Sequence, residues 1–253
     1  MINTRSIPKS WIWLEAEELC EWITKGTTPA RQYQSFGSGQ IPFIKVYNLT
    51  FDTSLDFETN PTFIPKQIHS TELKRSTVYP GDVLMNIVGP PLGKVSIVPD
   101  IFPEWNINQA IAVFRSKGKI MPEYLAMWLS SDSYLDWAMR RSKATAGQRN
   151  LTLEICRDSP IPLPDITEQY EIVLRLKKAI NWLSVISAEE NEATHLLDRL
   201  DQANLAKAFL GELVPQDPND EPASTLLDKI RLNRKENQKV KRFRKRESKE
   251  VAA

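Results

Sequence analysis

Short apolar runs separated by proline and glycine occupy the first two thirds of the chain. Four of them have the length and composition of β-strands: residues 41–46, 83–88, 94–98 and 110–114. In residues 122–139 the apolar side chains fall instead at mostly helical spacing: Leu125, Trp128, Leu129, Leu135 and Met139. We therefore predict an α+β domain over residues 1–165, in which a sheet of short strands carries one or two small helices.

A proline-rich passage at residues 160–164 marks the end of this domain. Its three prolines each fix their own φ angle and bias the preceding residue toward an extended conformation. Asp165 and Glu168 then form an Asp-x-x-Glu capping pattern, and no proline or glycine follows until Gly211. The sequence predicts one helix over residues 168–210, within a spacer segment at 166–211, and a C-terminal extension at 212–253.

Apolar residues recur along the predicted helix at spacings of mostly three and four, the pattern of a coiled-coil seam. The seam consists of Leu176, Ile180, Leu183, Ile186, Ala193, Leu197, Leu200 and Ala208, with interruptions at Glu190 and Asn204. Such a stripe packs either against the chain's own domain or against a partner helix. A helix over residues 168–210 is about 65 Å long, whereas the radius of gyration of the preceding domain is about 15 Å. The length favours a partner helix, which we expect to pair antiparallel with this one.

Charge is distributed unevenly along the chain. The net charge is +1, and residues 1–165 hold 17 Lys or Arg against 17 Asp or Glu, so a nucleic-acid surface there requires local segregation of charge. Eleven Lys or Arg lie between Lys229 and Lys249, which predicts a frayed basic helix or a disordered tail. This tail is either simply solvated or a non-specific phosphate-binding segment.

Composition places the chain among ordinary globular proteins, with 41% hydrophobic and 26% charged residues. It has no apolar stretch as long as a membrane span, and Glu15, Glu18 and Glu21 lie where a signal peptide is apolar. We expect a cytoplasmic protein with no membrane partner. Cys20 and Cys156 lie far apart without metal-ligand spacing, so we expect two reduced, packed thiols.

Three motifs look chemical, but their details argue against catalysis. The passage from Gly89 to Lys94 has three residues between its glycines, contains two prolines and lacks the Ser or Thr of a phosphate-binding loop. Residues 60–63, Asn-Pro-Thr-Phe, resemble the base-holding loop of amino-methyltransferases without its second proline, and a plain turn is the better interpretation. His69 and His195 belong to no nucleophile or metal motif. We therefore expect no catalytic residue and no metal site.

Three groups of motifs, in this order, resemble the specificity subunit of type I restriction-modification enzymes. The first comprises residues 13–19 and Gly26-Thr27-Thr28-Pro29. The second comprises residues 41–46, Gly81-Asp82-Val83-Leu84-Met85 and Asn108-Gln109-Ala110. The third comprises residues 148–151, 161–164, 168–169, 197–200 and 208–215. The resemblance covers about 230 residues.

The resemblance implies a target recognition domain that reads one half of a bipartite double-stranded DNA site, as part of defence against foreign DNA. The long helix would space two such domains and dock methyltransferase subunits, and through them the restriction subunits. S-adenosylmethionine, ATP and Mg²⁺ would be bound only by those partners, with no cofactor on this chain. Complete subunits of the family carry two recognition domains and two helices, so this chain is expected to be a half-subunit or the C-terminal half of a split gene.

A half-subunit would pair with a second copy or with another half-specificity subunit. The alternative function is an anchoring or regulatory module that does not read sequence itself, and a salt-resistant preference for one DNA sequence separates the two.

Residues that would contact DNA are polar or basic and lie in predicted loops, since Arg and Lys bind guanine or phosphate while Asn and Gln pair with adenine. The candidates are Thr27, Arg31, Lys45, Asn48, Asn86, Lys94, Asn108, Gln109, Gln148 and Arg149. Asn86, Asn108 and Gln109 have an alternative role as caps of turns.

Overall fold

The structure is a computed structural model that describes residues 7–145, 148–215 and 217–250. It forms two compact units, Met1–Trp182 and Leu183–Ala253, which are described separately below. The strands of the first unit are β1 (Ile12–Glu15), β2 (Cys20–Lys25), β3 (Ser35–Phe36), β4 (Ile41–Ile44), β5 (Thr62–Ile64), β6 (Thr77–Val78), β7 (Val83–Asn86), β8 (Val95–Ile97), β9 (Trp105–Ile107), β10 (Ile111–Ser116), β11 (Lys143–Thr145), β12 (Gln148–Asn150) and β13 (Pro160–Leu163).

Helices of the first unit are short and lie between these strands. They are α1 (Ala16–Leu19), α2 (Lys66–Ser70), α3 (Pro122–Leu129), α4 (Asp132–Arg141) and α5 (Leu153–Arg157), with single 3-10 turns at Arg31–Tyr33, Val46–Asn48 and Lys74–Ser76. Pro122 starts α3 at a position where a proline costs no hydrogen bond. The Ser131 side chain caps α4 by accepting a hydrogen bond from the Tyr134 backbone N–H. Of the one or two small helices expected in residues 122–139, the structure has two, α3 and α4.

A four-stranded antiparallel sheet, in the order β2-β10-β7-β8, forms the centre of this unit. Side chains alternate between its two faces, as expected of a strand. Val83, Met85 and Phe114 face one hydrophobic cluster, while Leu84 and Val113 face another. Because both faces of the sheet are covered, the strand sequences are continuous apolar runs and do not alternate between apolar and polar residues.

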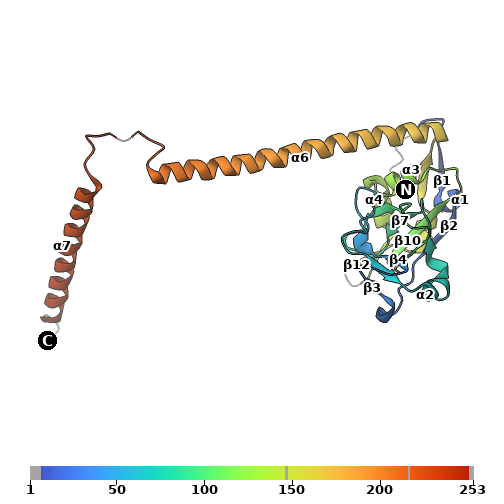
Figure 1. Ribbon diagram of the computed structural model, residues 1–253, viewed down its shortest axis with the longest axis horizontal. Helices are drawn as coiled ribbons and strands as arrows, with labels where there is room; N and C mark the ends of the chain where they lie inside the picture. Colours follow the sequence, from blue (N-terminus) through green and yellow to red (C-terminus); the bar gives the residue numbers. More distant parts are fainter. Residues whose placement is uncertain (1–6, 146–147, 216, 251–253) are drawn as a thin grey trace. The chain divides into compact units, whose positions relative to one another are not determined.

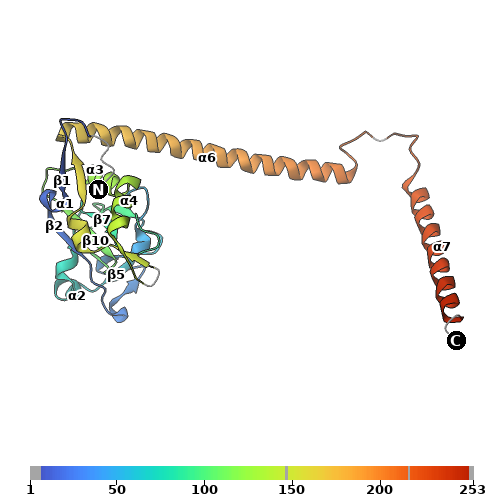
Figure 2. The same ribbon diagram turned by 180° about the vertical axis from the view of Figure 1, so that it is seen from behind.

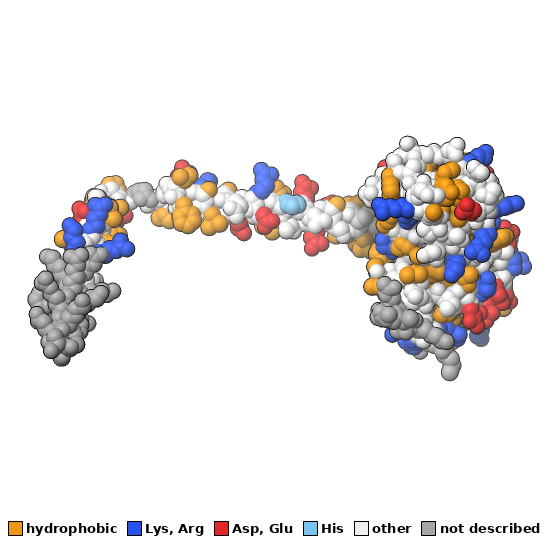
Figure 3. Space-filling view, turned by 90° about the horizontal axis from the view of Figure 1, so that it is seen from below, with side chains coloured by type: hydrophobic (Ala, Val, Ile, Leu, Met, Phe, Trp, Pro, Cys, Tyr) orange, Lys and Arg blue, Asp and Glu red, His pale blue; other side chains and the backbone are white. Residues whose placement is uncertain are grey.

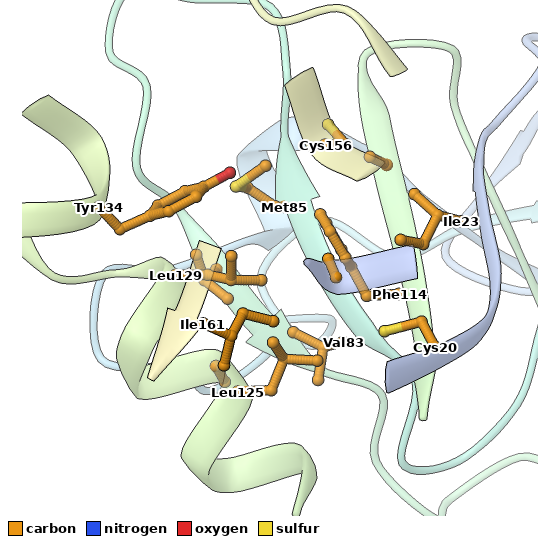
Figure 4. Close-up of a cluster of buried hydrophobic side chains, with 14 of the residues drawn as sticks. Cys20, Ile23, Val83, Met85, Phe114, Leu125, Leu129, Tyr134, Cys156 and Ile161 are labelled. Atoms are coloured by element: carbon orange, nitrogen blue, oxygen red, sulfur yellow. The ribbon is translucent and has the colours of Figure 1, made fainter. Parts of the chain in front are cut away.

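The first cluster joins the sheet to the helices. Side chains of α3, α4 and α5, together with Ile161 of β13, close over Phe114 and Met85, and Tyr134 is fully buried among them (Figure 4). The Tyr134 hydroxyl lies 3.0 Å from that of Ser159, which satisfies its polar group. Figures 1 and 2 show α3 and α4 together on the same side of these strands. The result is a helical layer packed on one face of the sheet.

The second cluster lies against a five-stranded sheet in the order β3-β5-β4-β9-β6. Within it β4 and β9 are parallel, with Ile44 opposite Ile107, and the other pairs are antiparallel. Trp105 is fully buried, and the rings of Phe57 and Phe102 each contact it edge-on with centroids 5.0 Å away. Together the two sheets and the helices give the α+β fold that the sequence predicts.

The predicted long helix is present as α6 (Ile166–Leu210), a single helix of 45 residues. Its first turns belong to the first unit, where Gln169 and Val173 are buried. The second unit contains the rest of α6 and a further helix, α7 (Ala223–Glu250), which covers most of the basic segment. Among the residues described, no helix combines the length and apolar character that crossing a membrane requires.

Candidate nucleic-acid interface

Loops gather at one end of the four-stranded sheet because its strands are antiparallel. Lys25 at the end of β2 pairs with Ala112 at the start of β10, and Ile111 pairs with Asn86 at the end of β7. Val95 at the start of β8 pairs with Met85. The loops that follow β2 and β7 and precede β8 and β10 therefore meet at a single edge, which we call the loop end.

Backbone hydrogen bonds join segments of the loop end that are far apart in the sequence. The Gly26 N–H donates to Ile111 O at 3.0 Å, and the Thr27 N–H donates to Ile107 O at 3.2 Å. The Ile87 N–H donates to Ala110 O at 2.9 Å. Gly26 is required here, because a Cβ at this position would lie 2.1 Å from Ile107 O and 2.2 Å from Asn108 O. The sequence motifs around residues 26 and 108 thus form one structural unit.

The second sheet brings Lys45 to the same place. Because β4 and β9 are parallel, both strands end at the same edge, and the Asn108 N–H donates to Ile44 O at 3.0 Å. Lys45 follows Ile44 directly. The 3-10 turn at Lys74–Ser76 adds Arg75, whose guanidinium donates to the Thr27 hydroxyl at 3.4 Å.

Two predicted DNA contacts, Asn48 and Asn86, are almost completely buried and brace turns. The Asn48 amide accepts from the Lys45 N–H at 2.9 Å and donates to Asp56 O at 2.8 Å. The Asn86 amide accepts from the Lys94 N–H at 2.9 Å and donates to Pro91 O at 2.7 Å. With their amides committed to backbone partners, both residues hold the loop end in shape and present no polar edge to a ligand.

Asn108 and Gln109 form the turn between β9 and β10. The Asn108 side chain is half-buried and accepts from the Ala110 N–H at 3.2 Å, so it caps this turn. The Gln109 side chain is exposed, and its backbone N–H donates to the Thr28 hydroxyl at 3.3 Å. Of the two, Gln109 has the side chain free to face solvent.

The basic candidates differ in how exposed their side chains are. Lys45 and Lys94 are half-buried, and Arg31 and Arg149 are exposed. The Arg149 guanidinium donates to Met139 O at 2.7 Å, at the end of α4. The backbone of Gln148 lies in β12, but its side chain falls outside the described residues. The candidates at the loop end itself are Thr27, Lys45, Lys94, Asn108 and Gln109.

Exposed aromatic side chains lie beside Lys45 and Lys94, and none of them was among the predicted DNA contacts. The Lys45 ammonium lies 4.9 Å from the ring centroid of Phe36 and 5.8 Å from that of Tyr47. The Lys94 ammonium lies 5.7 Å from the ring centroid of Phe51. Phe36, Tyr47 and Phe51 are 67%, 46% and 60% exposed. Their spacing in the sequence carries no periodic signal, so only the fold reveals that each stands beside a basic residue.

The buried histidine and the two buried cysteines of the first unit have structural roles. Buried His69 lies 2.8 Å from the Glu104 carboxylate through Nε2, while Asn106 donates to its Nδ1 at 3.1 Å. Burial raises the pKa of Cys20 and of Cys156 to about 12. Within the described part of the chain, no group of three or more His, Cys, Asp or Glu is arranged to hold a metal ion.

The long helix α6 presents its predicted seam to solvent. The seam positions Leu176, Ile180, Leu183, Ile186, Leu197 and Leu200 are between 38% and 62% exposed. Figure 3 shows hydrophobic side chains grouped on the surface near the C-terminal end of this helix. In the first unit the seam begins at an apolar groove of about 260 Å³, lined in part by Trp11, Trp128, Ile172 and Leu176.

The family model described as "Type I restriction modification DNA specificity domain" matches residues 8–195. The chain belongs to this family. The type I restriction enzyme EcoBI specificity subunit of Escherichia coli is 36% identical to it, over 68% of this chain and 37% of that subunit. The EcoDI specificity subunit of E. coli is 25% identical, over 90% of this chain and 50% of that subunit.

Solved structures of type I systems share the fold. The HsdS subunit from Thermoanaerobacter tengcongensis superimposes with a TM-score of 0.62 at 18% identity, over 87% of this chain and 53% of that one. A structure described as showing complex assembly and conformational transition of the type I R-M system superimposes with a TM-score of 0.66 at 23% identity, over 83% of this chain and 48% of that one. This chain therefore spans about half the length, or less, of the proteins that it matches.

Proposed function

We propose that the chain is a DNA sequence-specificity module of a type I restriction-modification system, which reads one half of a bipartite double-stranded site. The observation that carries the proposal is the convergence of Lys45, Lys94 and Gln109 at the loop end, in a member of the specificity family. Lysines supply phosphate contacts, and an exposed glutamine can pair with an adenine edge. Arg31, Arg75 and Arg149 extend this basic surface.

The buried asparagines have a supporting role in this proposal. Asn48 and Asn86 fix the backbone from which Lys45 and Lys94 project, because each amide is bonded to the N–H of one of these lysines. Preorganised contact residues lower the cost of ordering side chains on binding. We therefore assign them to positioning rather than to base contact.

Selection of bound duplexes from a random-sequence library tests DNA reading. The full chain is expected to enrich one short sequence, and its preference over scrambled duplexes should persist as salt is raised, while overall affinity falls. Equal affinity for all duplexes at every salt concentration would leave an anchoring module as the better assignment.

Catalysis and cofactors belong to partner subunits in this proposal. Methyltransferase subunits, and restriction subunits through them, would supply the sites for S-adenosylmethionine, ATP and Mg²⁺, and the chain would have no activity of its own. Co-purification with the methyltransferase subunit, followed by mapping of methylated adenines in the genome, identifies partner and target together. Turnover of S-adenosylmethionine or ATP by the purified chain alone would contradict this division.

We expect the chain to pair, through α6, with a second copy or with another half-specificity subunit. The exposed seam leaves apolar surface in water, at about 25 cal/mol per Å², and an antiparallel partner helix would cover it. Two copies related by a two-fold axis would read a palindromic site with a fixed spacer, and two different half-subunits would read an asymmetric one. The acidic positions Glu189, Glu190 and Glu192 weaken a pairing centred on them, because like charges would meet. They would instead face a methyltransferase subunit.

A further inference from the structure

The loop at residues 50–54 presents Phe51 beside the start of β8, at the loop end. The Val95 N–H donates to Thr50 O at 3.2 Å, and the Ile97 N–H donates to Thr53 O at 3.0 Å. The Thr50 N–H donates to the Ser96 hydroxyl at 3.1 Å. Since Ser96 is fully buried, these three bonds attach the loop along its length to the edge strand of the sheet.

Side chains inside the loop fix it further. The Asp52 carboxylate accepts from the hydroxyls of Thr50 and Ser54 and from the Ser54 N–H. These hydrogen bonds lower the pKa of Asp52 below its ordinary value, because they stabilise the ionised carboxylate. Thr53 has a φ angle of 69°, which residues other than glycine rarely adopt. The loop is therefore held in one conformation before any ligand arrives.

This rigid loop exposes a large apolar side chain. Phe51 is 60% exposed, and the Lys94 ammonium covers part of its ring at 5.7 Å from the centroid. An exposed aromatic ring on a fixed loop is suited to contact an apolar surface of a ligand. Because the loop is already ordered, little conformational entropy is lost when the ligand binds. The Lys94 ammonium beside the ring is a positive charge that can bind a phosphate.

Charge indicates which part of DNA the ring meets. The phenylalanine ring carries no charge and so adds no attraction to phosphates, which is left to Lys94 beside it. An element that is nearly neutral and apolar contributes discrimination between sequences rather than general affinity. The apolar feature that distinguishes base pairs in the major groove is the thymine 5-methyl group, and phenylalanine is among the side chains that contact it.

We infer that Phe51 is a specificity-determining residue that contacts the 5-methyl group of a thymine in the target half-site, with Lys94 bound to a neighbouring phosphate. The inference rests on the proposed DNA-reading function and names one of its base contacts. Ile101 offers a matched control, because it is 63% exposed and lies in the loop after β8, at the opposite end of that strand.

The experiment compares the full-length wild type with Phe51→Ala, Lys94→Gln and Ile101→Ala. Each protein selects duplexes from a random-sequence library, and its affinity is then measured for the wild-type consensus with each thymine in turn replaced by uracil, which lacks only the methyl group. For the wild type, one replacement is expected to lower affinity about fourfold, the effect of one buried methyl group. Phe51→Ala should lose that sensitivity and accept other bases there, whereas Ile101→Ala should behave as wild type.

Lys94→Gln separates the two roles. It should weaken binding to all duplexes and reduce the dependence of log affinity on log salt by about one unit, while keeping the thymine preference. The inference is overturned if Phe51→Ala selects the same sequence with unchanged uracil sensitivity, or if it weakens binding to every duplex equally. A wild type that selects no sequence would contradict the proposed function as well. Thermal unfolding of each variant checks that the exposed substitutions leave the fold intact.

Discussion

The loop end of the sheet and the seam of α6 differ in what the rest of the chain provides for them. At the loop end, Gly26 and Asn108 are bonded to other segments of the same unit and Asn86 braces its own loop, so hydrogen bonds within one chain hold this surface in place. Along α6, Leu183, Leu197 and Leu200 are each more than half exposed. A polar surface whose loops are held by hydrogen bonds within the chain is suited to a solvated ligand such as DNA. An exposed apolar stripe is suited to packing against another helix.

Gln169 marks the transition between these two regions. Its side chain is fully buried, accepts from the Met121 N–H at 2.9 Å and donates to Lys119 O and Pro164 O. These bonds fix the first turns of α6 to the recognition domain. The remaining turns contain no buried residue in the part of the helix that the structure describes. One helix thus serves two surroundings, and the predictions below act on each separately.

Gly26→Ala should disrupt the loop end most strongly. The added Cβ would meet backbone oxygens of Ile107 and Asn108, which cannot rotate away, so we expect a loss of about 3 kcal/mol, at the upper end for overpacking. Urea unfolding of the full chain measures it. Gly118→Ala is the control: Gly118 has a φ of 84° but open space around it, so only backbone strain of about 1 kcal/mol should appear. Equal losses for the two variants would argue against close packing at Gly26.

Gln169→Met should loosen the attachment of α6. The substitution keeps the volume but leaves the Met121 N–H and two carbonyl oxygens without their partner, which costs about 2 kcal/mol. Gln202→Met changes the same residue type at an exposed position on the same helix and should be nearly neutral. If both variants unfold at the same urea concentration as wild type, Gln169 does not anchor the helix.

Alkaline pH should destabilise the recognition domain through its two buried thiols. Their pKa values are raised from 9.0 to about 12, so folding favours the protonated form. The stabilisation is complete below pH 9 and is lost as the pH rises from about 9 to 12. By pH 10 each thiol should contribute about 1.4 kcal/mol less. In urea unfolding at pH 8 and 10, a double variant with Cys20→Ala and Cys156→Ala should lose less stability between these pH values than wild type.

Lys45→Ala should have the smallest effect, confined to the loop end. Removing one phosphate contact weakens DNA binding at all sequences and reduces the salt slope by about one unit. Fluorescence anisotropy with a labelled duplex at several salt concentrations measures the slope. Lys66→Ala, an exposed lysine on α2, makes the same change in net charge and should leave the slope unaltered. A similar change in both variants would indicate that only total charge matters.

Much of the fold could be predicted from the sequence where the signal is periodic or marked by proline and glycine. The long helix was predicted from uninterrupted helix-forming residues between Pro164 and Gly211, and α6 confirms it. The expected runs at 41–46, 83–88 and 94–98 contain β4, β7 and β8, and the run at 110–114 covers the first four residues of β10. The strands β3 and β9, of two and three residues, were missed, because they lie in no longer apolar run and so few positions cannot show alternation.

The site was predicted less well because residue type does not determine role. Asn48, Asn86 and Asn108 have the same amide as any base-reading asparagine, yet hydrogen bonds to backbone groups two to eight residues away direct all three into turns. Phe36 and Phe51 look like core residues in the sequence, but the loops that hold them leave both rings exposed. For Phe51 the outcome depends on contacts between distant segments, such as Thr50 with Ser96.

Light scattering tests most directly the claim that the recognition domain is complete within one chain while α6 needs a partner. At micromolar concentration the wild type should have twice the mass of the chain. The variant with Leu183→Asp and Leu197→Asp should be a monomer that unfolds in urea at the same concentration as an equally charged variant with Asp at Ser184 and Ala203, two positions outside the seam. A monomeric wild type, or a double variant that keeps the doubled mass, would contradict the claim.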